Sequence, residues 1–257
     1  MKRMKMSDVG FKGQVFGFIK FTPFVESFLS GDLYMNNFKK YIDIESASGE
    51  KGVGDKFEAA HVFTELTMNF FTQDTNELIM SGRTKKLNFR KNINEKRPLY
   101  CMFAIIGDML KVVNEDEKYY YTKFDLPNEQ IDKMIREFGD SLIFVTPSQF
   151  IDRITRTLNE KGYAYRGGLV KYDDYNINSS ARMSSYKNQG TDIYFWKDKY
   201  FENQYEYRIV LTDQEVDEAL IVNIGDISDI STIFNANEFF SDKFEIRLRK
   251  KGNLSIH

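Results

Sequence analysis

The sequence predicts an α+β fold, with a bent, mainly antiparallel sheet and three or four flanking helices. Three observations support this prediction. Many short runs of aromatic and β-branched residues are typical of strands, while only a few segments show helical periodicity. With 23 phenylalanines, 15 tyrosines and 42% hydrophobic residues, the chain can fill a wide core. Neither an internal repeat nor a long linker interrupts the sequence, so we expect a single domain over residues 1–257.

Three helices are predicted from their end signals and from apolar residues at helical spacing. The first is expected at residues 23–30, because Thr22 can cap a helix that begins at a proline and Gly31 can end it. Residues 127–138 and 147–161 each begin at a proline, place apolar side chains on one face and stop at a glycine. The sequence therefore predicts two amphipathic helices after the short first one.

Short runs rich in aromatic and β-branched residues predict the strands. They occupy residues 14–21, 32–37, 61–67, 77–81, 84–90, 99–106, 141–145, 163–172, 191–196, 205–211, 219–223 and 244–249. A tight turn at residues 81–83 is expected to join two of these strands. Glycines among polar residues predict a mobile surface loop at 44–56, and limited proteolysis is expected to cut first between residues 45 and 55.

The composition excludes several classes of site. Cys101 is the only cysteine, so no intramolecular disulfide can form, and its apolar neighbours predict that it is buried. Because His61 and His257 are the only histidines, zinc sites and Cys/His nucleophile pairs lack their residues. We therefore expect no metal site.

Charge and hydropathy indicate the cellular compartment and the classes of partner. The net charge of −2 gives no overall attraction to nucleic acid or to an anionic membrane. No apolar stretch at the N-terminus reaches the length of a signal peptide, because lysines interrupt it. The sequence therefore predicts a cytoplasmic protein that does not associate with membranes. The basic stretch at residues 83–97 leaves nucleic acid open as a partner, although such stretches are usually solvated surface.

Three segments of the chain resemble a bacterial and phage family of unknown function. They are residues 18–36, residues 54–58 and residues 199–210. The order of an early strand and helix, an acidic loop and a late Glu-Tyr-Arg strand is similar to the ADP-ribosyltransferase fold. The resemblance implies an ADP-ribosyltransferase-like protein that takes NAD as its cofactor and acts on a macromolecular target, such as a host protein.

The resemblance also assigns candidate site residues. Glu206 matches the catalytic carboxylate, which stabilises the positive charge that develops on the ribose as the nicotinamide bond breaks. Gln204 matches the residue that orients the acceptor. Lys20 and Thr22 stand where the family carries a His or Arg that grips NAD. Arg182, in a serine-rich run, matches a phosphate ligand of the Arg-bearing subclass.

The same residues have structural explanations that need no chemistry. On a strand over residues 205–211, alternation would turn the tyrosines to the core and leave Glu206 and Arg208 paired on a solvated face. Arg182 would lie in a solvated loop. Asp55 and Glu58 could bind a cation or pair with Arg182, but solvated surface is their default explanation.

A second class of function needs no catalytic site at all. The chain could be a non-catalytic phage or mobile-element protein that binds and inhibits a host defence protein. Such a protein needs an aromatic contact face, for which the candidates are Tyr119, Tyr120, Tyr121 and Phe124. The alternative is that these rings cover the end of a sheet.

Overall fold

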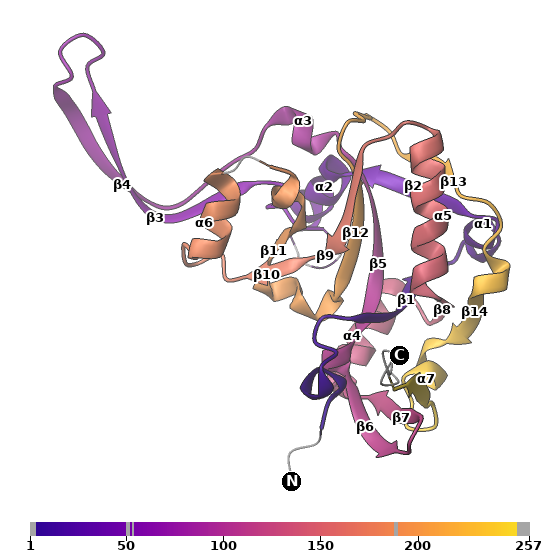
Figure 1. Cartoon of the computed structure of the whole chain (residues 1–257). Coiled ribbons are helices and arrows are strands. Elements are labelled where there is room, and N and C mark those ends of the chain that lie inside the picture. Colours follow the sequence, from indigo (N-terminus) through magenta and orange to yellow (C-terminus); the bar gives the residue numbers. More distant parts are fainter. Residues whose placement is uncertain (1–3, 50–51, 53, 188–189, 251–257) are drawn as a thin grey trace, which may run out of the picture. The chain divides into compact units, whose positions relative to one another are not determined.

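The computed structural model describes residues 4–49, 52, 54–187 and 190–250 (Figure 1). Its mixed α and β architecture, with open and mainly antiparallel sheets, confirms the predicted fold class. The chain divides into two compact units: unit 1 comprises residues 1–33, 102–157 and 223–257, and unit 2 comprises residues 34–101 and 158–222. The single-domain organisation and the likeness to ADP-ribosyltransferases stay predictions.

Unit 1 is built around strand β1, which pairs antiparallel with β8 and with the end of β5, while β8 also pairs with β14. A second antiparallel sheet has the order β15-β7-β6. The elements of unit 1 are η1 (Met6–Val9), β1 (Val15–Phe21), α1 (Val25–Leu29), η2 (Gly107–Met109), β6 (Leu110–Glu115), β7 (Tyr119–Phe124), α4 (Asn128–Phe138), β8 (Ser141–Val145), most of α5 (Pro147–Glu160), η5 (Ser228–Ile230), β14 (Ser231–Asn235), α7 (Ala236–Phe239) and β15 (Ile246–Arg249). These bounds confirm all three predicted helices.

Aromatic rings fill the core of unit 1, as the composition predicts. The ring of Phe18 on β1 lies 6.0 Å from that of Phe150 on α5. A second group of rings surrounds Phe239 of α7, and Phe124 of β7 belongs to it with a centroid distance of 5.2 Å. Phe124 is therefore core, and only the Tyr119 end of the aromatic face expected at residues 119–124 is exposed.

In unit 2, β12 pairs antiparallel with β9, β10 pairs parallel with β11, and β3 pairs antiparallel with β4. β5 begins in unit 2, where it pairs with β2. The elements are most of β2 (Asp32–Asn37), α2 (Phe38–Ser48), β3 (His61–Phe71), β4 (Leu78–Phe89), α3 (Asn92–Glu95), the first part of β5 (Pro98–Ile106), β9 (Tyr165–Leu169), β10 (Lys171–Asp173), α6 (Ser180–Lys187), η3 (Thr191–Phe195), β11 (Trp196–Asp198), η4 (Lys199–Gln204), β12 (Glu206–Leu211) and most of β13 (Leu220–Asn223).

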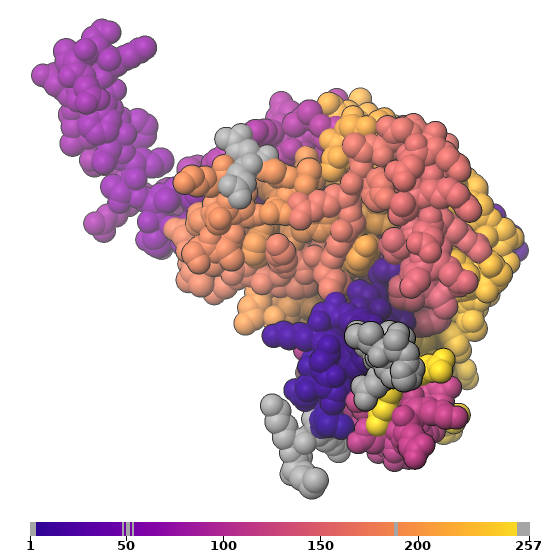
Figure 2. Space-filling model, in the orientation of Figure 1, coloured from indigo at the N-terminus to yellow at the C-terminus, as the bar shows by residue number. Residues whose placement is uncertain are grey.

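Strands β3 and β4 form a long two-stranded ribbon that projects from the rest of unit 2 (Figures 1 and 2). The turn predicted at residues 81–83 is wrong, because β4 runs through it and Gly82 pairs with Met68. The ribbon instead turns at residues 72–77, where Asn76 takes a φ of 55°. We call residues 61–89 the arm.

Three other predictions of secondary structure in unit 2 are wrong at least in part. The loop expected at 44–56 is wrong in its first part, which belongs to α2: the Asn37 side chain caps this helix by accepting a hydrogen bond from Lys40 N, and the helix ends only at Gly49. Residues 50, 51 and 53 of that loop lie outside the described residues. The connection around Arg182 is helix α6, and residues 191–195 form a 3₁₀ helix rather than a strand.

Among the helices that the structure describes, none combines the length and the apolar character needed to cross a lipid bilayer.

Candidate functional site

Four buried charged side chains of unit 2 bind one another, and we call them the charge cluster: Glu58, Lys197, Glu206 and Arg208. Arg208 donates two hydrogen bonds to the Glu58 carboxylate, from Nη1 at 2.7 Å and from Nη2 at 2.6 Å. It also bonds the Glu206 carboxylate through Nε and, at 3.2 Å, through Nη2. Lys197 Nζ lies 3.0 Å from Glu206 Oε2 and 3.4 Å from Glu58 Oε1. The four side chains are at most 8% exposed.

Strand β12 orients two members of the charge cluster. Glu206 and Arg208 are two residues apart and therefore face the same side of the strand. Tyr205, at the end of η4, has a φ of 41° and turns the chain into β12. The solvated face expected for these residues is wrong, since Glu206 is 6% exposed and Arg208 is fully buried. The tyrosines expected in the core are partly exposed instead.

Opposite charges compensate the burial of the cluster. Burial alone would raise the pKa of a carboxyl group, but Arg208 and Lys197 hold the pKa of Glu206 well below its usual range. Burial also opposes the charge of Lys197, yet Glu206 and Glu58 raise its pKa above the usual value. Glu206 and Lys197 therefore stay ionised at neutral pH.

Gln204 and Glu206 lie together, because both contact Lys197. Gln204 accepts a hydrogen bond from Lys197 Nζ at 2.8 Å, and its Nε2 donates one to the carbonyl of Gly52 at 3.0 Å. The Cys101 thiol is also hydrogen-bonded to Glu206, and burial raises the pKa of this thiol. Cys101 as a whole residue is partly exposed rather than fully buried as expected.

Asp55 is a buried carboxyl group beside the charge cluster. It is 1% exposed, and its Oδ1 accepts a hydrogen bond from Phe57 N at 2.8 Å. Its Oδ2 is buried and has no hydrogen-bond partner among the described residues. Burial, followed by the nearby charge of Glu58, raises the pKa of Asp55 to about 7. The solvated surface expected for Asp55 and Glu58 is therefore wrong.

Arg182 is fully buried on α6 rather than solvated. Its guanidinium forms an ion pair with Asp173 and donates to the carbonyls of Asp174 and Ile177. It also lies over the ring of Tyr175, with a distance of 4.6 Å to the centroid. The side chain thus holds the segment 173–177 in place. Glu58 pairs with Arg208 and not with Arg182.

Lys20 and Thr22 belong to unit 1, whereas Glu206, Gln204 and Arg182 belong to unit 2. Lys20 lies on β1 opposite Ile143 of β8. The Thr22 hydroxyl accepts a hydrogen bond from Phe24 N at 3.0 Å, but the N-cap of α1 is Phe24 and no side chain caps this helix, so the predicted Thr22 cap is wrong.

The basic stretch at 83–97 is not one continuous phosphate-binding stripe. Arg90 donates to the carbonyls of Glu58 and Lys56 and pairs with Glu95. Other cations of the stretch bond to neighbouring segments of unit 2: Lys86 to Asn176, Lys96 to Asp217 and Arg97 to Gln214. Most of its positive charge therefore fixes local structure.

The arm carries a row of exposed apolar side chains that sequence reasoning missed. Phe70 pairs with Met80 across the ribbon, and Met68 pairs with Gly82, so these side chains share one face with Leu66. The opposite face is polar in its middle, at Thr67, Asn69, Ser81 and Arg83, and apolar at the tip, where Phe71 pairs with Leu78. Five apolar side chains near the tip are between 44% and 66% exposed: Phe70, Phe71, Leu78, Ile79 and Met80. Alternating apolar and polar residues at 66–70 were the available signal.

The base of the arm is fixed to unit 2 while its far end is not. Thr64 N donates to Asn178 Oδ1 at 2.9 Å, and Asn178 Nδ2 returns a hydrogen bond to Thr64 O at 2.7 Å. The His61 ring stacks on Phe89 at 4.7 Å and meets Tyr186 edge-on at 4.6 Å. In the part of the chain that the structure describes, the side-chain hydrogen bonds of residues 66–84 all stay within the arm.

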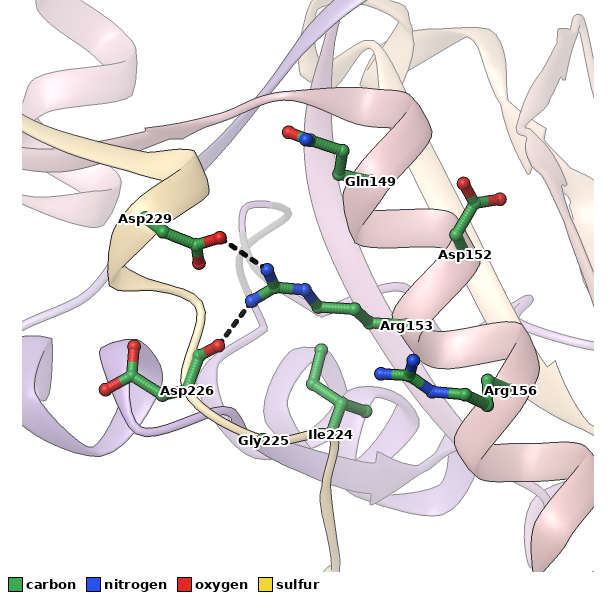
Figure 3. Close-up of a pocket in the computed structure, with 8 residues that line it drawn as sticks. All are labelled: Gln149, Asp152, Arg153, Arg156, Ile224, Gly225, Asp226 and Asp229. Atoms are coloured by element: carbon green, nitrogen blue, oxygen red, sulfur yellow. Dashed lines mark hydrogen bonds and ion pairs between the residues drawn. The ribbon is translucent and has the colours of Figure 1, made fainter.

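Figure 3 shows a pocket in unit 1 that the sequence did not reveal. Helix α5 provides one wall, with residues 149, 152, 153 and 156 on one face, and residues 224–229 provide the other. Arg153 bonds to Asp229 at 2.6 Å and to the carbonyl of Asp226. Because cationic and anionic groups alternate and Arg153 is neutralised, the pocket favours neither an anion nor a cation.

The charge cluster and the arm are the two features of unit 2 on which a functional argument can rest. The first is buried and charge-compensated, and the second is exposed and apolar. A comparison with models of protein families, with curated proteins and with solved structures finds no match to this chain.

Proposed function

We propose that this chain is a non-catalytic binding protein that docks a protein partner, such as a host protein, through the distal arm. The exposed apolar face at the arm tip carries this proposal. Scattered apolar residues are normal on protein surfaces, but a contiguous patch indicates an interaction site. Phe70 and Met80 offer large side chains directly opposite each other, with 44% and 56% exposed. Buried in a partner's pocket, such side chains supply most of the binding energy of an interface.

The charge cluster supports the same proposal. A catalytic carboxylate must reach its substrate, but both oxygens of Glu206 are bonded to Arg208 or Lys197. Buried pairs of this kind give a core its specific arrangement, and breaking one of them leaves an uncompensated charge. We therefore interpret the charge cluster as a structural element that holds β11 and β12 together, through Lys197 and Arg208.

The double variant Phe70→Ser, Met80→Ser tests the proposal. Tagged protein is expressed in the native host, and copurifying proteins are identified by mass spectrometry. We expect the variant to bind the copurified partner at least about thirtyfold more weakly than the native chain, since a lost anchor costs about 2 kcal/mol or more.

The matched control for this experiment is Asn69→Ala, Ser81→Ala, which changes the hydrogen-bonded pair on the polar face. Control and native chain should bind alike, and both variants should unfold at the native temperature because the changed side chains are exposed. Equal partner binding by the native chain and the tip variant would exclude the arm tip as the docking element.

ADP-ribose transfer from NAD is the second candidate function. The observation that favours it is that Gln204 and Glu206 both accept a hydrogen bond from Lys197 Nζ, while Gln204 is partly exposed. On this proposal Glu206 stabilises the developing ribose charge and Gln204 orients the acceptor.

Labelled NAD and host lysate test the transferase proposal. Label transfer is expected from the native chain and from Glu58→Gln, but Glu206→Gln should transfer at least about a hundredfold more slowly. Glu58→Gln is the matched control because it also removes one carboxylate charge from the charge cluster and so destabilises it similarly. Absence of label transfer by the native chain, together with no NAD binding in calorimetry, would reject this function.

A further inference from the structure

We infer that two copies of this chain pair through the outer edges of β4, antiparallel, to form a four-stranded sheet from two arms. The inference rests on the proposed function in one respect, since it takes the arm as the docking element and names its first occupant. Three features of the arm carry it: an open strand edge, a self-complementary order of charges, and an apolar face that the pairing would extend.

The first feature is the open edge. Within the described residues, β3 and β4 form a sheet of only two strands, so the outer edge of β4 has no strand partner. An exposed edge presents unpaired N–H and C=O groups and is a template for another strand. β4 runs for 12 residues from Leu78 to Phe89, which is longer than most strands. A two-stranded ribbon is marginally stable in water by itself, so added strands would stabilise it.

The second feature is the order of charges along the arm. The tip carries Asp74 and Glu77, and the middle of β4 carries Arg83 and Lys85; all four residues are exposed. In an antiparallel pair centred near Ser81, the acidic tip of one arm lies beside the basic middle of the other. A parallel pair would instead set like charges together, which is destabilising. The charge order therefore selects a second copy in the antiparallel direction.

The third feature is the result of the pairing. Strands joined edge to edge keep their faces, so the apolar residues of both arms would form one wider face. Leu66, Met68, Phe70 and Met80 of each copy would contribute to it. The pair of copies would thus present about twice the apolar surface of one arm to the protein partner. Self-pairing and partner docking would then use different parts of the same arm, the edge and the face.

Charge reversal, either at the acidic tip or in the basic middle of β4, tests the inference. Self-association of the purified protein is measured by analytical ultracentrifugation. We expect the native chain to form a concentration-dependent dimer. Arg83→Glu, Lys85→Glu makes the middle of β4 acidic like the tip, and Asp74→Lys, Glu77→Lys makes the tip basic like the middle of β4. Each double variant alone should be at least about tenfold weaker in self-association, because like charges then oppose each other. An equimolar mixture of the two should form a heterodimer.

Lys161→Glu, Lys199→Glu is the matched control for Arg83→Glu, Lys85→Glu, since it makes the same change in net charge at exposed sites of unit 2 outside the arm. It should dimerise like the native chain. A native chain that stays monomeric, or a mixture that fails to form heterodimers, would overturn the inference. Neither result would affect the docking proposal, which is judged separately by partner copurification with the Phe70→Ser, Met80→Ser variant.

Discussion

Replacing Arg208 with methionine is expected to lower the free energy of unfolding by about 3–5 kcal/mol, because it leaves two buried carboxylates short of their main cation. In the native chain Arg208 binds Glu58 and Glu206 and also donates to the carbonyl of Tyr194 at 2.8 Å. Methionine keeps an unbranched apolar stem like that of arginine but offers no hydrogen-bond donor. Urea unfolding at neutral pH, followed by circular dichroism, measures the change.

Two comparisons separate charge burial from loss of packing. Arg166→Met breaks the exposed pair with Asp192 and should cost less than about 1 kcal/mol. Adding Glu58→Gln to Arg208→Met removes one of the stranded charges, so the double variant should be less unstable than the sum of the single changes. Strict additivity of the two substitutions would show that they do not act on one charge cluster.

Asp55→Asn is expected to stabilise the protein above pH 7 by up to about 4 kcal/mol and to have little effect near pH 4. The native pKa of Asp55 is raised from 3.8 to about 7, so the folded chain keeps a proton there that the unfolded chain has already lost. Stability of the native chain therefore falls as the pH rises from about 4 to about 7. Asparagine is neutral throughout and removes this dependence.

Unfolding in urea at pH 5 and at pH 8 measures this effect, which should be more than twice as large at pH 8. Asp116→Asn is a control of opposite sign, because hydrogen bonds from Tyr121 and from the backbone N–H groups of Lys118 and Tyr119 lower the pKa of Asp116. Removing that carboxylate should destabilise the chain at neutral pH rather than stabilise it. An Asp55→Asn effect of equal size at both pH values would contradict burial of an ionisable group.

The sequence predicts the elements whose signals are local. Helices α4 and α5 follow from their prolines, their glycines and an apolar face, and α1 follows from its apolar spacing and from Gly31 just beyond its end. The sequence predicts the arm only in part. Gly82 suggests a turn, but β4 continues through it, and the chain turns instead near Asp74 and Asn76. A glycine without positive φ can continue a strand, and nothing in its neighbours shows which of the two it does.

The candidate site was likewise predicted in part: the proximity of two of its residues was predicted, and their burial was not. Gln-Tyr-Glu at the start of a late strand correctly predicts that Gln204 and Glu206 lie together. Their burial could not be predicted, because alternation along β12 is the same whichever face is solvated. Partners from distant segments decide the matter: Glu58 lies 150 residues before Arg208 and still provides its bidentate carboxylate.

By itself, therefore, the sequence determines the α+β class and the three helices, and its single cysteine rules out an intramolecular disulfide. Hydrogen-bonding capacity, capping and apolar periodicity act over a few residues and can be read in order along the chain. Only the tertiary structure decides that Glu206, Arg208 and Arg182 are buried and that the apolar face of the arm is exposed. A residue is buried when segments distant in the sequence fold against it. The arm tip is exposed because, among the described residues, no such segment packs against it.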